Sequence, residues 1–382
     1  MRIGRINDNV TPAIDEFVLK VASRCNIDCD YCYEYNQGDT SWKLQPKRIS
    51  LDTVCTLASR IHEHAVRHGI ERVSVGIHGG EPLLLGPELF EKVCCALFTG
   101  IKGMGTGLDI SVQTNGMLIT RDFVEVFKKF DVKVGVSLDG NRWHNDRHRL
   151  TKGGATTFAR VIGGVSILRE NAPHLFSGIL AVVDLENDGV SVVNALYETG
   201  ARNIDLLLPH HNWDKPPDKN SDSKTPYADW YMRIWAPWVR GDWPGLRIRF
   251  LENIVMRLTG HPGIYEQMSV SPATLVAIST SGGIEGVDTL KSTGNSSHLT
   301  TFNIRDHPFD DVLEQRFYKE RCFPMEALSE ACKSCDIGDL CVGGYLPHRF
   351  SKENGFANPS VYCKDLYALV GRIERDLQKG NI

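Results

Sequence analysis

The stretch CNIDCDYC, residues 25–32, places three cysteines in the pattern C-x3-C-x2-C directly after an apolar, strand-like run at 16–22. Three thiolates at this spacing can bind three irons of a [4Fe-4S] cubane, which leaves the fourth iron without a protein ligand. A zinc knuckle and an ordinary ferredoxin site also use such cysteines, but a zinc knuckle needs a fourth cysteine or histidine nearby. No further cysteine occurs before Cys55, so the stretch favours a cubane with one open iron.

Apolar runs typical of strands alternate with amphipathic helical patterns from residue 16 to about 210. This alternation predicts an α/β fold with a parallel sheet built of βα units. Six units are too few for a closed eightfold barrel, so we expect an open, partial (β/α)6 TIM-like barrel with its catalytic groups at the carboxyl ends of the strands. The expected strands are 16–22, 72–77, 108–113, 133–138, 177–182 and 203–208, and the expected helices between them are about 51–68, 87–99, 120–130, 156–171 and 189–200.

The composition is that of an ordinary globular protein, with 42% hydrophobic and 24% charged residues among 382 and a formal net charge of −4. No basic tract predicts nucleic-acid binding, and no apolar run of about 18 residues predicts a membrane-spanning helix. The first fifteen residues lack the apolar core of a secretory signal, so we expect a cytoplasmic protein. Eleven cysteines in that setting indicate metal or redox chemistry rather than disulfides.

The sequence after the expected barrel divides into further regions. A polar, Pro-rich loop at 211–225 separates the barrel from an aromatic helix at about 227–239 and from a β-hairpin within 275–290. Beyond residue 320 the chain is rich in Cys, Gly and Pro with little periodicity, so we expect metal to replace a hydrophobic core there. The expected parts are an N-terminal extension at 1–15, the barrel at 16–225, a bridging region at 226–320 and a small cysteine-rich domain at 321–382.

A second cysteine set lies near the C-terminus, where Cys332-x2-Cys335-x5-Cys341 is followed by Cys363. Tight ligand spacing with one distant return suits a fully ligated iron–sulfur cluster, and a structural zinc site with four thiolates is the alternative. Cys322 lies outside this pattern, and it is interpreted as an extra ligand, a capping thiol or an inert buried residue. The other cysteines, Cys55, Cys94 and Cys95, fall in helical patterns and are interpreted as small buried apolar residues.

The stretch CNIDCDYC, with the aromatic Tyr31 before its last cysteine, resembles the motif of the radical S-adenosylmethionine (SAM) superfamily. The resemblance implies that Cys25, Cys29 and Cys32 hold a [4Fe-4S] cluster, and that SAM chelated by its open iron is cleaved to a 5′-deoxyadenosyl radical. Three further family-like motifs follow successive expected strands, and each alone would be a common turn sequence. They are His78-Gly79-Gly80-Glu81-Pro82, Gln113-Thr114-Asn115-Gly116 and Ser137-Leu138-Asp139-Gly140, with Arg149 twelve residues after Ser137.

The resemblance assigns SAM contacts to these motifs. Gly79 and Gly80 would let the backbone approach the SAM amino group, and Glu81 would accept a hydrogen bond from it. Ser137 would make a polar contact to SAM, and the Arg149 guanidinium would pair with its carboxylate. The full implied cofactor-binding set is Tyr31, His78, Gly79, Gly80, Glu81, Pro82, Asn115, Ser137, Asp139 and Arg149.

The four C-terminal cysteines resemble the SPASM domain of peptide-modifying relatives, in which these positions bind the second auxiliary [4Fe-4S] cluster. A complete SPASM domain holds two auxiliary clusters, but here Val287 and Tyr345 stand where two cysteines are usual, and no cysteine lies between Cys95 and Cys322. We therefore expect two [4Fe-4S] clusters in total. Asp288 is retained, and in sulfatase-maturing relatives this position takes a proton from the substrate, so it is a candidate general base; a solvated hairpin aspartate is the alternative.

Several longer stretches resemble a SPASM subgroup that matures ribosomally made peptides, including cyclophane-forming (triceptide) synthases. They are YCYEYNQGDTSW (31–42), LLLPHHNWDKPP (206–217), SGGIEGVDTL (281–290), CVGGYLPHRFS (341–351) and NPSVYC (358–363). This resemblance implies that a carbon radical on a precursor peptide attacks an aromatic ring to form a C–C crosslink.

Two other activities are alternatives to crosslinking. One is a radical dehydrogenase or epimerase acting on a peptide residue or a small sugar-like metabolite. The other, an iron–sulfur carrier without SAM chemistry, conflicts with the SAM-contact motifs. Expected partners are the precursor peptide and a reductant such as flavodoxin or ferredoxin. Because only about fifteen residues precede the first strand, leader recognition is expected to use the catalytic or C-terminal domain or a separate leader-binding protein.

Overall fold

The structure is a computed structural model that describes residues 11–218, 222–294 and 296–380, so most of the expected N-terminal extension lies outside the described residues. All six expected strands and the five helices between them are confirmed to within a few residues. The strands are β1 (Glu16–Ala22), β3 (Arg72–Gly79), β4 (Gly107–Thr114), β5 (Lys133–Ser137), β7 (Phe176–Val182) and β8 (Asn203–Leu207), and the helices are α1 (Leu51–His68), α2 (Pro87–Gly100), α3 (Arg121–Phe130), α5 (Phe158–Asn171) and α6 (Gly189–Glu198).

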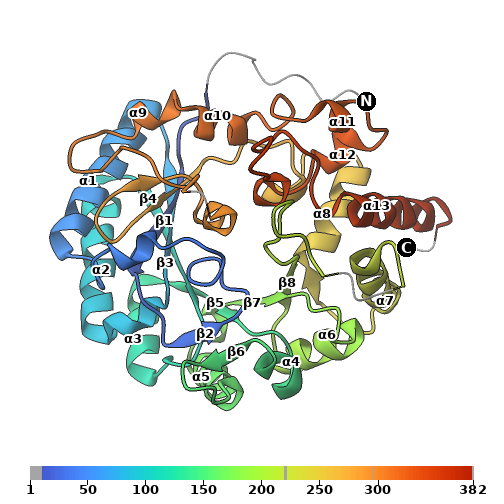
Figure 1. The fold of residues 1–382 in the computed structure, drawn as a ribbon. Coiled ribbons are helices and arrows are strands. Elements are labelled where there is room, and N and C mark those ends of the chain that lie inside the picture. Colours follow the sequence, from blue (N-terminus) through green and yellow to red (C-terminus); the bar gives the residue numbers. More distant parts are fainter. Residues whose placement is uncertain (1–10, 219–221, 295, 381–382) are drawn as a thin grey trace.

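These strands form the centre of one nine-stranded sheet with the order β11-β10-β1-β3-β4-β5-β7-β8-β9. Every pairing between neighbours is parallel except that of β10 (Leu275–Ile278) with β11 (Ile284–Glu285). Figure 1 shows α1, α2, α3, α5 and α6 on the outer side of the curved sheet. The predicted partial barrel is therefore present.

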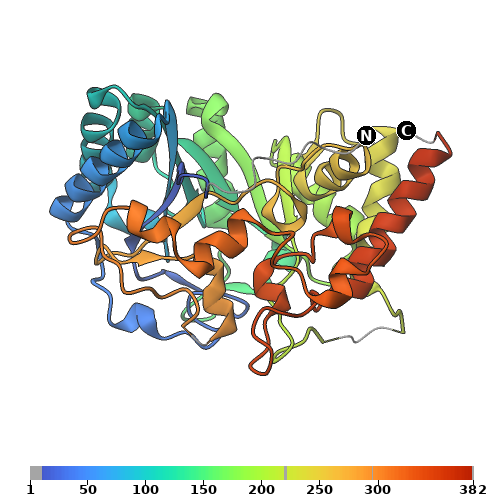
Figure 2. The same ribbon diagram turned by 90° about the horizontal axis from the view of Figure 1, so that it is seen from above.

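The expected hairpin extends this sheet, because β10 pairs in parallel with β1, and its turn lies between Ile278 and Ile284. The bridging region also contains α7 (Pro226–Arg240), β9 (Arg247–Ile248) and α8 (Arg249–Leu258). Asp288 begins a short 3-10 helix, Asp288–Thr293, directly after the hairpin. Viewed from above, the segments that follow β1 and β11 lie on the same side of the sheet (Figure 2).

The tail beyond residue 320 departs from the expectation of little periodicity. Helix α13 (Cys363–Gln378) spans 16 residues and buries Leu366, Leu369, Val370 and Ile373. These residues recur at helical spacing, so this part of the tail has an apolar face that packs against α7 and α8. The remaining C-terminal elements are short: α9 (Asp310–Leu313), α10 (Arg316–Cys322), α11 (Glu330–Lys333) and α12 (Gly338–Cys341).

A small antiparallel sheet of β2 (Ile27–Cys29) and β6 (Arg149–Thr151) stands apart from the main sheet. Its register places Cys29 directly opposite Arg149, and α4 (Arg142–Asp146) leads into β6. Pairing over only three residues thus brings two predicted site residues together although 120 positions separate them in the chain.

Candidate active site

The three cysteines of the first set lie at the carboxyl end of β1 and in the β2 loop that follows it. Cys29 is buried and Cys25 and Cys32 are half-buried. Asn115 Nδ2 lies 3.8 Å from Cys25 Sγ, and Arg149 Nη1 lies 3.9 Å from Cys29 Sγ. Burial raises the pKa of Cys25 and Cys32 to about 12 and that of Cys29 to about 11, so these thiols become thiolates against a strongly cationic partner such as iron.

In the part of the chain that the structure describes, the side chains of His64, His68 and Asp310 bring three possible metal-ligand atoms within 4.8 Å of one another. This group is a structural contact rather than a metal site. His64 Nε2 accepts a hydrogen bond from the Ile14 N–H at 3.1 Å, which leaves the ring proton on Nδ1. Nδ1 in turn lies 2.8 Å from Asp310 Oδ1. A protonated ring nitrogen has no lone pair for a metal, so the contact ties α1 to α9.

Arg149 is held by a carboxylate and faces the cysteines. Its Nε donates to Asp139 Oδ2 at 3.1 Å, and the same oxygen accepts from the Tyr31 hydroxyl at 2.5 Å. Asp139 Oδ1 accepts from the Val182 N–H at 3.0 Å, so both carboxylate oxygens are used. Tyr31, Asp139 and Arg149 therefore form one connected group beside Cys29, with the guanidinium fixed in place.

The glycines of the second motif are required by the protein backbone itself. A Cβ at Gly79 would lie 2.3 Å from Ala22 O, and one at Gly80 would lie 2.4 Å from Arg24 O. The Gly80 N–H donates to Ala22 O at 2.8 Å, which closes β3 onto the chain just before Cys25. Their role in this structure is close packing against the cysteine loop, in addition to the cofactor approach that the resemblance implies.

Glu81 is fully buried, and its carboxylate is occupied by protein donors. Oε1 accepts from the Leu83 N–H at 2.9 Å and the Thr114 hydroxyl at 2.7 Å, and Oε2 accepts from the Asn115 N–H at 2.8 Å. Burial raises the pKa of Glu81 to about 7. The side chain thus connects the motif after β3 to the motif after β4, whereas the sequence pattern assigned it to the SAM amino group.

The remaining motif residues lie around the same strand ends. Pro82 begins a short 3-10 helix, Pro82–Leu85, and Asn115 donates through Nδ2 to Asn26 Oδ1 at 2.8 Å, beside Cys25. The Ser137 hydroxyl, at the end of β5, accepts from Gln113 Nε2 at 2.9 Å. His78 is the exception, because its imidazole lies toward β1 and Asp288.

A buried cluster of ionisable side chains, here called the charged cluster, occupies the interior beside the cysteine loop. The Lys20 ammonium donates to Asp288 Oδ2 at 2.5 Å and to Glu34, and it lies 3.3 Å from His78 Nδ1. Lys291 donates to Glu34 Oε2 at 2.8 Å and lies 3.8 Å from Glu285 Oε2. The charged cluster comprises Lys20, Glu34, His78, Glu285, Asp288 and Lys291.

Alternating charges fix the ionisation of this cluster. Burial disfavours the anion of Asp288, but the Lys20 ammonium outweighs burial and holds the pKa of that carboxyl well below its usual range. Burial and the same ammonium lower the pKa of His78 to about 4, so its ring is neutral at physiological pH. Burial raises the pKa of Glu285 to about 7. Asp288 is thus a buried anion, which excludes the alternative of a solvated hairpin aspartate.

Sequence reasoning missed most of the charged cluster. Lys20 had a signal, because it is a lysine inside the strand EFVLKVA, which is otherwise apolar after Glu16, at an inward position two residues after Val18. Glu34 and Lys291 had no such signal in the sequence. They contact the rest of the charged cluster only because the cysteine loop and the hairpin fold against β1. The Tyr33 hydroxyl, which donates to Asp288 Oδ2 at 2.8 Å, was missed for the same reason.

The four C-terminal cysteines surround one cavity of about 90 Å³. Cys332 lies in α11, Cys335 follows it, Cys341 ends α12 and Cys363 begins α13. Burial raises the pKa of Cys341 to about 12, and the other three thiols lie close enough to add to that effect. Four cysteines around one cavity are the ligand set that a fully ligated iron–sulfur cluster requires, and the SPASM resemblance favours the cluster over zinc.

Apolar and polar side chains fill the positions where a further cluster would need cysteines. Val287 and Tyr345 are 3% and 8% exposed, and the Tyr345 hydroxyl lies 2.5 Å from Thr289 Oγ1. The rings of Tyr345 and His348 both contact His210, with centroids 5.9 and 5.8 Å away. Cys322 is 2% exposed and donates to the Ala273 carbonyl, which favours its inert interpretation.

The other free cysteines split between two environments. Cys94 is buried in α2 as expected, but Cys55 and Cys95 are exposed, so their interpretation as buried residues was wrong. Each lies on the outward side of its helix. The apolar pattern of the neighbouring residues predicts a buried face but does not show on which face a single cysteine lies.

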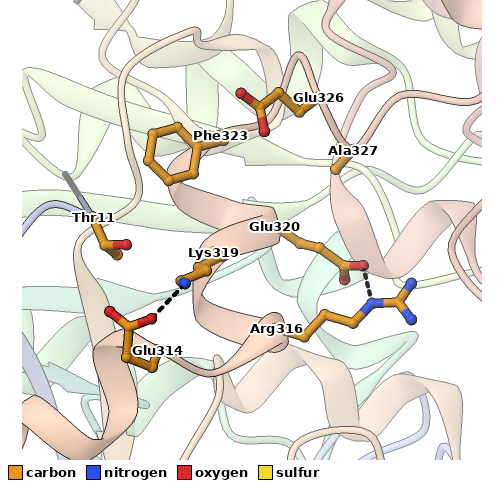
Figure 3. A pocket seen from close by; sticks show the side chains of 8 residues that line it. All are labelled: Thr11, Glu314, Arg316, Lys319, Glu320, Phe323, Glu326 and Ala327. Carbon is orange, nitrogen blue, oxygen red and sulfur yellow. Dashed lines mark hydrogen bonds and ion pairs between the residues drawn. The ribbon is translucent and has the colours of Figure 1, made fainter. Parts of the chain in front are cut away.

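A surface hollow of about 540 Å³ beside α10 carries no comparable chemistry (Figure 3). Four of its charged residues form two pairs, Lys319 with Glu314 at 2.7 Å and Arg316 with Glu320 at 2.7 Å. Exposed pairs of this kind contribute little to binding or stability.

Comparison with known proteins identifies relatives that share the cysteine loop's superfamily and the fold of this chain. The pattern of the radical SAM superfamily matches residues 19–189. The serine-type anaerobic sulfatase-maturating enzyme of Bacteroides thetaiotaomicron is 32% identical over 377 residues, which span 92% of this chain and 87% of that enzyme. The structure of anSMEcpe with bound AdoMet and Cp18Cys peptide has a TM-score of 0.80 at 19% identity, covering 95% of this chain and 99% of that one. Streptococcus suis SuiB bound to precursor peptide SuiA has a TM-score of 0.61 at 17% identity, covering 93% and 77%.

The fold and the cysteine loop define an enzyme that uses SAM and a [4Fe-4S] cluster. This chain belongs to the radical SAM superfamily. Its fold is a radical SAM partial barrel followed by a SPASM-type C-terminal region, as predicted. No helix in the described ranges is long and apolar enough to cross a membrane, and a cytoplasmic location stays a prediction.

Proposed function

We propose that this enzyme modifies a ribosomally synthesised precursor peptide by joining a side-chain carbon to a nearby aromatic ring. When bound, SAM and the cluster at Cys25, Cys29 and Cys32 supply a 5′-deoxyadenosyl radical that abstracts a hydrogen atom, and a cluster at the C-terminal cysteines accepts one electron. Forming the crosslink and restoring the aromatic ring then also releases one proton. The chain must therefore supply a proton acceptor.

Asp288 is the observation that carries this proposal. It is anionic, 6% exposed, and bonded to Lys20 from β1 and to Tyr33, which directly follows Cys32. Because Tyr33 directly follows Cys32, its hydrogen bond holds the Asp288 carboxylate next to the cysteine loop. An epimerase returns a hydrogen atom to the same carbon and has no need for a base paired with an electron acceptor, so the arrangement favours a net oxidation.

The other residues of the site position the reactants. The guanidinium of Arg149, fixed by Asp139, is suited to a carboxylate such as that of SAM. Glu81 holds the strand ends that carry Asn115, and the glycines before it hold the cysteine loop against β3. We further propose that the chain binds two [4Fe-4S] clusters, accepts electrons from a flavodoxin or ferredoxin, and recognises a peptide leader directly or through a separate protein. We also propose that the chain is divided into the four regions expected from the sequence, which are residues 1–15, 16–225, 226–320 and 321–382.

A second candidate is dehydrogenation of one peptide residue without crosslinking. It is favoured by the 32% identity to a serine-type sulfatase-maturating enzyme. Both reactions remove two hydrogens in total and use the same base and acceptor, so they differ only in the fate of the peptide radical. The buried side chains of Val287 and Tyr345 distinguish this chain from the complete SPASM arrangement. Crosslinking is kept as the first candidate because several stretches of the sequence resemble cyclophane-forming synthases.

The test is anaerobic incubation of the reconstituted enzyme with SAM, dithionite and peptides encoded beside its gene. Crosslinking predicts a peptide lighter by two hydrogens, unreactive toward hydroxylamine, that does not fragment between the joined residues. An aldehyde that reacts with hydroxylamine would instead establish dehydrogenation, and an unchanged mass with altered stereochemistry would establish epimerisation. Deoxyadenosine formation without any peptide change, across all peptides tried, would contradict the proposal.

A further inference from the structure

The proton accepted by Asp288 needs a route to solvent, because Asp288 and the charged side chains that pair with it are buried. Asp288 and Lys20 have side chains that are 8% and 5% exposed, and those of Glu34 and Lys291 are 8% and 7% exposed. His78 is the exception in the charged cluster, with a side chain that is 28% exposed. It is therefore the member of the cluster through which solvent can be reached.

His78 also lines a cavity of about 450 Å³ inside the barrel. The cavity is bounded by Gly135 and Asp205 from the middle of their strands, by Gln113 near the carboxyl end of β4, and by Ser177 and Asn203 at the amino ends of β7 and β8. Ser177 and Asn203 are exposed, so the cavity reaches the surface there. This opening is at the end of the barrel opposite to the cysteine loop, which follows the carboxyl end of β1.

Small residues next to His78 keep this space open. Gly76 lies two residues before His78 on the inward face of β3, and Ser111 on β4 is its partner in register. A Cβ at Gly76 would lie 3.6 Å from the Ser111 hydroxyl, in ordinary contact, so larger side chains at these two positions would narrow the cavity beside the imidazole. The small residues at positions 76 and 111 thus leave the cavity open next to His78.

We infer that His78 passes the proton received by Asp288 into this barrel cavity, from which it leaves at the amino ends of β7 and β8. The inference rests on the proposed oxidation. His78 Nδ1 lies 4.0 Å from Asp288 Oδ2 and 3.3 Å from the Lys20 ammonium, which bridges the two. In the balanced step, protonated Asp288 returns to its carboxylate, the neutral imidazole becomes imidazolium, and the imidazolium then gives a proton to water.

The tautomer and the charges around His78 suit this role. Because Nδ1 accepts from Lys20, the neutral ring carries its proton on Nε2, so it can gain a proton at one nitrogen and release one at the other. The charged groups facing the ring are Lys20 from β1, Asp288 after the hairpin and Glu34 after the cysteine loop. The pKa of His78, about 4, lies above that of Asp288 and below physiological pH, so each transfer runs downhill.

The test compares His78→Gln, which keeps a polar side chain but cannot carry the proton, with the unchanged enzyme. General acid–base groups contribute about 100-fold or more to proton transfer, so we expect SAM cleaved per modified peptide to rise about 10- to 100-fold, while deoxyadenosine formation without peptide continues. An unaltered ratio would overturn the inference. Loss of deoxyadenosine formation would also overturn it, because it would make His78 a SAM contact, as the sequence motif implied.

The route through the cavity is tested by chemical rescue. Added imidazole should restore coupling in His78→Ala, and Ser111→Leu in the same protein should weaken that rescue by narrowing the cavity beside residue 78. The matched control is Ser166→Leu on the exposed face of α5, which should leave rescue intact. Rescue that Ser111→Leu leaves undiminished would show entry from the peptide side and would contradict the route.

A measurement without peptide separates this inference from the proposed function. In histidine-labelled protein, the NMR signal that His78→Gln removes should titrate reversibly with a pKa well below 6.5. A ring that never titrates in the native protein is closed to solvent protons and overturns the relay, even if peptide oxidation is established. Conversely, a titrating ring in an enzyme that modifies no peptide would leave the route standing and refute only the proposed function.

Discussion

Replacement of Lys20 by methionine should destabilise the protein by about 3–5 kcal/mol, and more so at high pH. Lys20 pairs with Asp288 and Glu34, and all three side chains are less than a tenth exposed. Removing one partner of a buried ion pair costs about 3–5 kcal/mol because the remaining charges are left uncompensated. Here two carboxylates lose their shared cation, and only Lys291 still pairs with one of them.

The pH dependence follows from the direction of the pKa shifts. With Lys20 present, the pKa of Asp288 is depressed, so its contribution to stability is present at neutral pH and is lost only in acid. Without Lys20, burial dominates and raises the pKa of Asp288 above its unfolded value. The folded variant then binds more protons than the unfolded chain, so its free energy of unfolding falls as the pH rises from about 5.5 to about 8.

The assay is urea unfolding of the cluster-free chain, followed by tryptophan fluorescence at both pH values. The double variant Lys20→Met/Asp288→Asn should recover part of the loss, since one uncompensated charge is gone. Lys128→Met removes an exposed helix lysine paired with Glu125 and should cost less than about 0.5 kcal/mol. A loss below about 1 kcal/mol for Lys20→Met, or a loss independent of pH, would refute the reasoning about the charged cluster.

Three further predictions concern the cofactor sites. Cys363→Ser should lower the iron content from about eight to about four per chain while deoxyadenosine is still formed; iron remaining near eight would show that Cys363 is no ligand. Arg149→Lys should weaken SAM binding about 10- to 100-fold by calorimetry, because lysine lacks the fork that contacts both Asp139 and the cofactor side; equal affinity would remove Arg149 from the site. Gly80→Ala would place a Cβ 2.4 Å from Arg24 O, so reconstitution should lose the absorbance of the first cluster, and normal loading would contradict the packing argument.

The barrel could be predicted from the sequence because its signals are local and repeated. Each strand is an apolar run, and each helix has a periodic apolar face with end signals, such as Ser50 capping the Thr53 N–H and Gly69 ending α1 in a left-handed conformation. The cysteine sets were found by spacing alone. Helix α13 was missed because the Cys- and Gly-rich sequence before it obscured the apolar repeat that begins at Leu366.

The interior of the site could not be predicted because it depends on long-range contacts. Lys20 and Asp288 are 268 positions apart and meet only because β10 pairs with β1. His78 stands in a family-like motif, yet its ring follows the inward alternation of β3, where Lys20 is its register partner. The motif alone predicted that His78 belongs to the site, but it did not predict the contacts with Lys20 and Asp288 that determine the chemistry of the ring.

The central claim is that the cysteine loop generates the radical, and one measurement tests it most directly. The anaerobically reconstituted protein, given SAM and dithionite, should form 5′-deoxyadenosine, whereas a variant with Cys25, Cys29 and Cys32 all changed to alanine should form none while it keeps about four irons at the C-terminal site. Deoxyadenosine formation by the triple variant would contradict the account.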